Sequence, residues 1–209
     1  VNMSVLLSES WPTKTRAIAV GSLLTSYQAG VFASGMLVHL SSNWRLSFAF
    51  GAFPIVLTAV ILFLMQEKSK QTPFEITPQV VSDKRSLVVG SVLFGSLLIA
   101  YWASISWIPT WIQDLAGTLG QEKSTATMWH GIAAVGGCFV AGPLVTWMGR
   151  IRTMILAFSL AFMSTVSLLL MNKEFSWWVY MNYALLGLAI GTAQAVLYIY
   201  LPELFPSKI

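Results

Sequence analysis

The sequence predicts an all-α polytopic membrane protein, with about six transmembrane helices that form part of a twelve-helix, two-bundle fold. Hydrophobic residues make up 56% of the chain and charged residues 10%, whereas soluble domains carry roughly 25% charged residues. Apolar runs long enough to cross a hydrocarbon core of about 30 Å recur along the chain. A motif near the start, Glu9-Ser10-Trp11-Pro12-Thr13-Lys14, returns near the end as Glu203-Leu204-Phe205-Pro206-Ser207-Lys208, which suggests a unit of about six helices used twice.

The expected spans are separated by polar junctions. The first span, about 17–40, is rich in small residues that allow close helix packing, and the second, about 46–65, follows a short junction. Residues 66–86 form the longest polar stretch and are expected to link two bundles. The chain would then comprise the end of one bundle (1–65), the linker, and most of a second bundle (87–209). The remaining spans are expected at about 87–112, 126–147, 153–171 and 177–201.

Lysine and arginine are unevenly divided between the two sides of these spans. With both motif copies on one side, that side holds nine of the twelve basic residues. Loops rich in lysine and arginine remain in the cytoplasm, so we expect the motif loops and the linker to be cytoplasmic and the protein to lie in the cell (inner) plasma membrane. The nine residues are Lys14, Arg16, Lys68, Lys70, Lys84, Arg85, Arg150, Arg152 and Lys208.

Composition and motifs argue against several classes of function. The net charge of +4 is spread over short loops, whereas a nucleic-acid binder gathers basic residues on one face. The single cysteine, Cys138, lies in an apolar run, so we expect no disulfide framework, no metal site and no cofactor. The sequence contains no His-Glu-x-x-His and no Gly-x-Ser-x-Gly motif, so we expect no enzyme activity and no catalytic residues.

The two motif copies resemble the major facilitator superfamily, whose members have two six-helix bundles. Glu9, Pro12 and Arg16 match the family's acid–x–x–Pro–x–x–x–Arg motif after the fourth helix. Glu203 and Pro206 resemble the equivalent loop after the tenth helix. The resemblance implies a piece of a longer protein that runs from the end of helix four to the end of helix ten.

A second motif extends the resemblance. Gly149, Arg150 and Arg152 resemble the glycine-and-basic turn between helices eight and nine, although Thr146 stands where the family's first copy has an aspartate. The motif at the start, the Asn43-Trp44-Arg45 junction and the ending look closest to the sugar and metabolite:proton symporter branch. Sialic-acid and other organic-acid carriers are the nearest resemblance within it.

The resemblance implies a carrier that works by alternating access. Acids and arginines at cytoplasmic helix ends could then pair when the gap between the bundles is closed and separate when it opens. The alternative is that these residues serve only as topology signals and helix caps. The candidates for the gating motif are Glu9, Pro12, Arg16, Gly149, Arg150, Arg152, Glu203 and Pro206.

Substrate contacts are expected from polar or aromatic side chains at mid-membrane depth, because a buried amide needs a hydrogen-bond partner. The resemblance places the third and sixth spans beside the central cavity. Hydrogen bonding between helices is an equally good explanation for such residues. The candidates for substrate binding are Gln28, Tyr101, Trp102, Asn182, Gln194 and Tyr198.

The ionisable residues within the spans are few. His39 and His130 could take part in proton coupling, but a packing or interface role is favoured for both. No acidic residue, lysine or arginine is expected at mid-membrane depth. Proton coupling therefore follows from the resemblance only, and its acid is expected outside this chain.

These observations predict a secondary active transporter that moves a small polar solute, an organic acid or a sugar, by proton symport. The full-length protein is expected to be a monomer in the lipid bilayer, with the solute and protons as its partners. A non-transporting receptor or sensor on the same fold remains the alternative, and a channel is disfavoured because no filter-like loop is visible. The 209-residue chain alone is expected not to transport, because a cavity needs both bundles.

Overall fold

The computed structural model describes Pro12 and residues 15–41, 43–64, 84–117, 120–171 and 174–204. Within these ranges every regular element is a helix and no strand occurs, which confirms the predicted all-α class. Five of the helices are long and apolar enough to cross a membrane. The elements are α2 Arg16–Leu40, α3 Trp44–Gly51, α4 Phe53–Leu64, α5 Lys84–Ala116, α6 Glu122–Met148, α7 Arg150–Met171 and α8 Trp177–Leu204.

The second expected span is not one continuous helix, because it is divided into α3 and α4 at Ala52. Gly51 ends α3, and Pro54, which has no backbone N–H to donate, stands in the first turn of α4. The N–H of Ala52 donates to the carbonyl of Ala49 at 3.1 Å, which makes a tighter turn than an α-helix. Neither α3 nor α4 alone has the length of a span, so the expected single helix is corrected to two consecutive helices.

Two connections are shorter than expected. Gly149 alone joins α6 to α7, which already begins at Arg150. Its backbone has a φ of +84°, a conformation open to glycine because it has no Cβ. The connection between the spans expected at about 87–112 and 126–147 is confined to 117–121, since the flanking helices extend into it from both sides.

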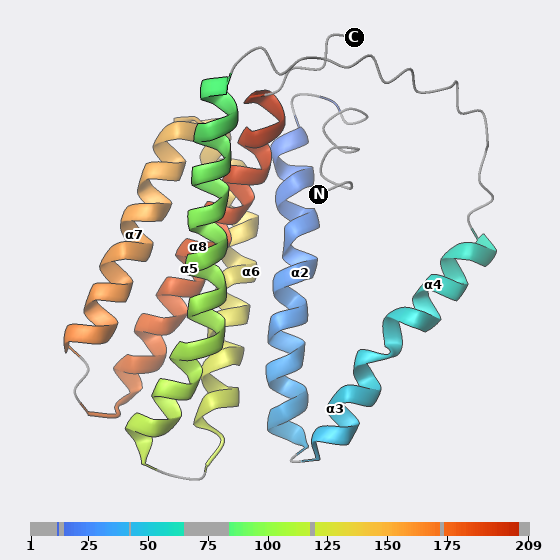
Figure 1. The fold of residues 1–209 in the computed structure, drawn as a ribbon, viewed down its shortest axis with the longest axis vertical. Helices are drawn as coiled ribbons and strands as arrows, with labels where there is room; N and C mark the ends of the chain where they lie inside the picture. The colour runs from blue at the N-terminus through green and yellow to red at the C-terminus, as the bar shows by residue number, and fades with distance from the viewer. Residues whose placement is uncertain are drawn as a thin grey trace.

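Helix α6 lies at the centre of the molecule. It packs along α2 on one side and α8 on the other, while α7 lies against α8 and α5 contacts both α6 and α8 (Figure 1). In the described part of the chain, α3 contacts α2 and α4, and α4 contacts α3 alone; in Figure 1 both extend away from the five long helices. Helix α2 is therefore docked on α6 and α8, which come much later in the chain.

Glycines let α6 approach both neighbours closely. A Cβ added to Gly137 would lie 2.2 Å from the carbonyl oxygen of Leu188 in α8. A Cβ added to Gly131 would lie 2.7 Å from the backbone nitrogen of Phe32 in α2. Close backbone contact of this kind is typical of helices that associate in membranes.

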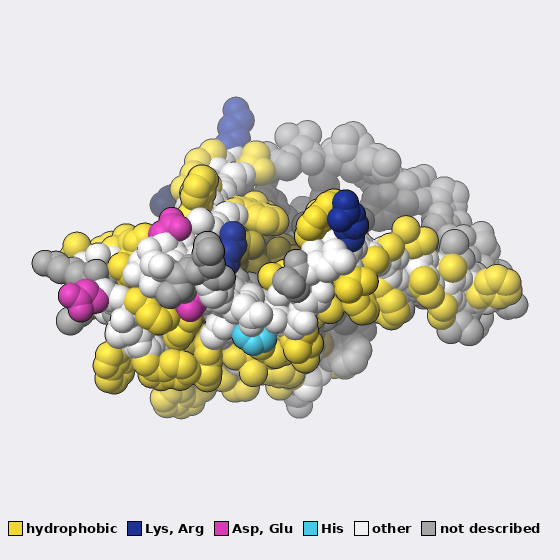
Figure 2. All heavy atoms as spheres, turned by 90° about the horizontal axis from the view of Figure 1, so that it is seen from below, with side chains coloured by type: hydrophobic (Ala, Val, Ile, Leu, Met, Phe, Trp, Pro, Cys, Tyr) yellow, Lys and Arg dark blue, Asp and Glu magenta, His cyan; other side chains and the backbone are white. Residues whose placement is uncertain are grey.

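Large apolar side chains cover the flanks of the molecule. Phe63 is 90% exposed and Trp147 80% exposed, and Figure 2 shows hydrophobic side chains around the perimeter with few charged ones between them. A soluble protein would bury such side chains. In a bilayer they face lipid, which is as apolar as they are.

Candidate functional site

A hydrogen bond between two buried amides joins α2 to α8. Nε2 of Gln28 donates to Oε1 of Gln194 at 2.7 Å. Gln28 has no exposed surface and Gln194 is also buried. Oε1 of Gln28 accepts no hydrogen bond from the described residues. Because an unsatisfied buried acceptor costs about 1–3 kcal/mol, this oxygen is a place where a further donor would be stabilising.

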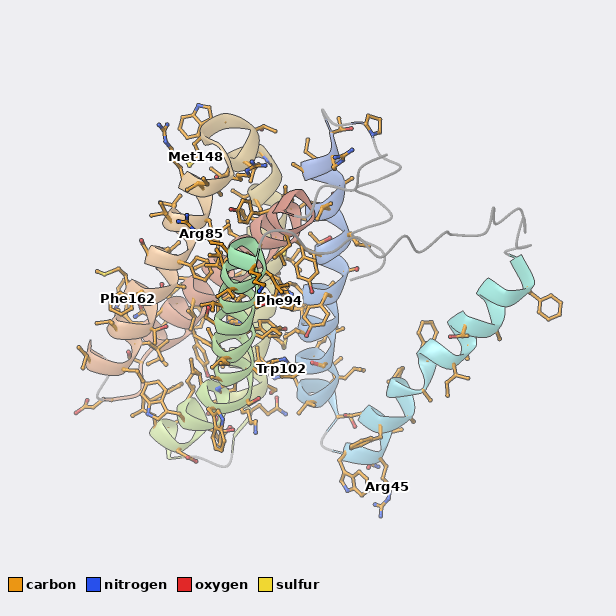
Figure 3. The ribbon with its side chains drawn as sticks, turned by 45° about the horizontal axis from the view of Figure 1, so that its top comes forward. Arg45, Arg85, Phe94, Trp102, Met148 and Phe162 are labelled. Atoms are coloured by element: carbon orange, nitrogen blue, oxygen red, sulfur yellow. The ribbon has the colours of Figure 1, made fainter. Side chains whose placement is uncertain are left out.

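An aromatic cluster lies beside the amides. The ring of Tyr101, from α5, is 5.8 Å from the ring of Tyr27, which precedes Gln28 in α2. Tyr101 is buried, and its hydroxyl makes no hydrogen bond within the described ranges, although the Tyr27 side chain approaches it. Trp102 contacts Tyr101 edge-on but is 56% exposed (Figure 3). Of the two α5 candidates, only Tyr101 is therefore enclosed.

Tyr198 connects α8 to α5. It lies one turn after Gln194, and its ring meets that of Phe94 edge-on at 5.7 Å. Phe94 and Tyr101 are seven positions apart on α5, so they share one face of that helix, and Figure 3 shows Phe94 on α5 between its two ends. Helices α2, α5 and α8 thus bring amides and aromatic rings to one region of the molecule.

Asn182 is placed differently from the other candidates. Its Oδ1 accepts a hydrogen bond from the hydroxyl of Ser167 at 3.1 Å, which links α8 to α7. This contact faces away from α2, and it is the kind of bond between helices that was the alternative to solute binding.

The glycine-and-basic turn lies at one end of the helices. The guanidinium of Arg150 is 5.5 Å from the centre of the Tyr200 ring, close enough for a cation–π contact between α7 and α8. Arg150 and Arg152 are both exposed. The turn at Gly149 thus carries two cations at the surface, next to the end of α8.

The start of α2 lies beside this turn. A Cβ added to Gly142 of α6 would lie 3.0 Å from the Cα of Ile18, so the first turn of α2 meets the last turns of α6. Pro12 is exposed and Arg16 half-buried. The acids expected to face these cations are Glu9 and Glu203. Glu9, the side chain of Glu203 and the motif residue Pro206 all lie outside the described residues.

Some neighbours of the site were not singled out from the sequence. Tyr27 stands next to a predicted residue, and Phe94 lies two turns before another, so helical spacing around Gln28 and Tyr101 was the signal that could have found them. Within the described residues, no three His, Cys, Asp or Glu side chains gather in a way that could hold a metal ion.

Comparisons with known proteins complete these observations. The sequence profile of the Major Facilitator Superfamily matches residues 1–209. The chain is similar to the cis,cis-muconate transport protein of Acinetobacter baylyi (strain ATCC 33305 / BD413 / ADP1), with 21% identity over 166 residues. That match covers 70% of this chain and 40% of the relative, so the chain spans well under half of the relative's length. No solved structure matches. Together with the membrane-length helices, the profile shows that this chain belongs to the Major Facilitator Superfamily.

Proposed function

We propose that the full-length protein is a secondary active transporter that moves a small polar solute by alternating access. The observation that carries this proposal is the hydrogen bond between Gln28 and Gln194. It joins α2, assigned to one bundle, to α8 of the other. Alternating access needs contacts between bundles that break and re-form around a central site. A hydrogen bond between membrane helices is worth about 0.6–2 kcal/mol, which is weak enough to be exchanged.

A solute can replace this bond directly. Each glutamine amide offers two N–H donors and one carbonyl acceptor. A carboxylate or hydroxyl that enters between α2 and α8 would accept from Nε2 of Gln28, and a solute hydroxyl would donate to its unsatisfied Oε1. The hydrogen bond between Gln28 and Gln194 could then break at little cost, because the solute would provide both amides with new hydrogen-bond partners.

An organic acid suits this region better than a sugar. The rings of Tyr27, Tyr101 and Tyr198 supply flat apolar faces with hydroxyl groups at their edges. Such surfaces accommodate a planar, unsaturated solute. The similarity to a protein named for cis,cis-muconate transport supports the same choice.

Proton symport follows from the charges around the amides. The middle of α2 and of α8 contains no lysine or arginine. An anion bound there would lose its hydration without gaining a fixed positive charge from these helices, which is costly in a medium of low dielectric constant. Movement together with a proton removes that cost, so we assign the protein to the proton-coupled carriers.

The charges at the helix ends support the proposed orientation. Met148 and Arg85 lie toward one end of the molecule and Arg45 at the other (Figure 3). The first end also holds the turn with Arg150. We place this end in the cytoplasm, with the cations of the turn as part of a gate, and the protein in the inner membrane as a monomer. Residues 1–65 and 87–209 would then belong to two bundles, and 66–86 would link them.

Uptake into vesicles tests the proposal. The full-length protein is reconstituted into liposomes and given radiolabelled cis,cis-muconate, with and without an inward proton gradient. We expect gradient-driven accumulation, and we expect Gln28→Ala and Gln194→Ala each to lower uptake at limiting solute by about tenfold, the effect of one lost hydrogen bond to a charged group.

Ser26→Ala is the matched control, because among the described residues the Ser26 hydroxyl bonds to the Leu23 carbonyl of its own helix. It should transport like the wild type. Muconate binding without accumulation would instead identify a receptor on this fold. Neither binding nor uptake of muconate or other organic acids would refute the proposed solute class.

A further inference from the structure

A histidine of α6 lies buried against α8, apart from the amide pair. His130 of α6 has no exposed surface. Its ring stacks on that of Tyr183 in α8, with centroids 4.5 Å apart and an interplanar angle of 27°. Gly187 of α8 also packs closely against the ring, because a Cβ added there would lie 3.0 Å from Nδ1 of His130. The imidazole is therefore held by packing on α8.

The polar atoms of this ring are not satisfied. Neither Nδ1 nor Nε2 makes a hydrogen bond with the described residues, and the backbone of Tyr183 approaches the ring without hydrogen-bond geometry. A neutral imidazole carries one donor and one acceptor, and each costs about 1–3 kcal/mol when buried without a partner. Packing alone would be served better by phenylalanine, so the histidine needs another explanation.

Further unsatisfied groups lie near Tyr183, the residue on which the histidine stacks. The hydroxyl of Tyr183 donates to the backbone oxygen of Ser104 in α5 at 3.1 Å, while the hydroxyl of Ser104 itself has no partner in the described ranges. Tyr101 lies one turn earlier on the same face of α5 and has an unsatisfied hydroxyl too. Water that enters after a small separation of the helices would hydrogen-bond to these hydroxyls and to the histidine.

The surroundings offer no fixed charge to the ring. Tyr183 from α8 stacks on the ring, Ser104 and Tyr101 of α5 lie beyond Tyr183, and α2 meets the adjacent Gly131 through the backbone of Phe32. No charged side chain of the described residues acts on His130. An imidazolium buried here would therefore be strongly destabilised, whereas a hydrated one would not.

We propose that His130 is a proton-binding residue of the transport cycle, neutral in the arrangement seen here and protonated when α6 and α8 separate near their first turns. A proton from the water that enters binds the free ring nitrogen. When the helices close again, the proton returns to water, because the buried ring cannot keep the charge. Proton binding and helix separation then favour each other by the same free energy. This inference rests on the proposed transport function.

Hydrogen–deuterium exchange tests it without any solute. In the full-length protein in nanodiscs, backbone exchange in residues 123–134 and 178–187 is followed by mass spectrometry from about pH 8 to about pH 5, the range in which histidine takes up a proton. After correction for intrinsic exchange rates, we expect about a tenfold increase at the acidic end, since tenfold corresponds to one pH unit of coupling. We expect His130→Gln and His130→Phe to abolish the increase.

His39→Gln is the matched control, because His39 lies near the end of α2, where its Nδ1 is 3.3 Å from the Ser124 hydroxyl. It should retain the pH-dependent exchange. Exchange in the wild type that does not depend on pH, or variants at position 130 that keep the dependence, would overturn the proposal even if one variant folds poorly. Failure to accumulate muconate with pH-dependent opening intact would count against the proposed function and leave this inference standing.

Discussion

The amides of Gln28 and Gln194 show how one pair of side chains can serve both stability and movement. Each is buried in an apolar environment, where it needs a partner. Their mutual hydrogen bond satisfies one donor and one acceptor, and the remaining groups stay available. The pair thus stabilises the contact between α2 and α8 modestly, and under the proposed function the unsatisfied Oε1 of Gln28 would receive the solute.

This arrangement makes the two residues interdependent in stability. Gln28→Leu or Gln194→Leu alone leaves one buried amide without its partner, which costs about 1–3 kcal/mol. The double variant removes both polar groups, so we expect it to be more stable than either single variant. Thermal unfolding of the full-length protein in detergent, followed by tryptophan fluorescence, measures all three. Additive losses of stability would show that the two amides do not act as a pair.

Helix α6 owes its central place to close backbone contact on two faces. Gly137 faces α8, where the hydroxyl of Thr192 donates to the Gly137 carbonyl at 3.1 Å. On the same seam, the thiol of Cys138 donates to the Gly191 carbonyl at 3.4 Å. These contacts need the two helix backbones to lie closer than ordinary side chains would permit. Close backbone contact therefore holds α6 against α8 along this seam.

Substitutions at two neighbouring glycines, Gly136 and Gly137, distinguish the effect of helix packing on stability from the effect of helix propensity. A Cβ at Gly137 would collide with the Leu188 carbonyl, whereas a Cβ at Gly136 meets nothing within 4 Å. We expect Gly137→Ala to destabilise the full-length protein by about 1–3 kcal/mol through overpacking. We expect Gly136→Ala to be neutral or to stabilise by up to about 1 kcal/mol, because alanine favours a helix. Melting temperatures in detergent compare the two, and equal effects would contradict the α6–α8 geometry.

At the level of the whole molecule, the helices present their termini at two faces. The start of α2, the start of α5, the turn at Gly149 and the end of α8 lie at one face, and the junction before α3 lies at the other (Figure 1). An even number of crossings between the two motif copies would produce this arrangement. The uneven distribution of basic residues supports the proposal that the first face is cytoplasmic.

Cysteine labelling tests this orientation. In the full-length protein with its native cysteines replaced, Lys123→Cys and Arg152→Cys each introduce one exposed thiol at opposite ends of the bundle. A membrane-impermeant maleimide applied to intact cells should label the cysteine at position 123, and the one at position 152 only after permeabilisation. Labelling of both from the same side would contradict the assignment.

The sequence by itself determined the membrane class, the positions of five spans and the presence of basic residues beside both motif copies. These properties depend on hydropathy, length and charge, which act locally along the chain against a bilayer of fixed thickness. The interruption at Ala52 was also encoded locally, by Gly51 and Pro54, but a continuous apolar run concealed it.

Only the tertiary structure decided which candidate residues meet. Gln28 and Gln194 are 166 positions apart, Trp102 is exposed while the adjacent Tyr101 is buried, and His130 stacks on a tyrosine of another helix. Lipid and protein interior are equally apolar, so the hydrophobic pattern of a span does not show which face is buried. Contacts between faces depend on how distant helices pack, and glycines such as Gly137 fix that packing through backbone approach.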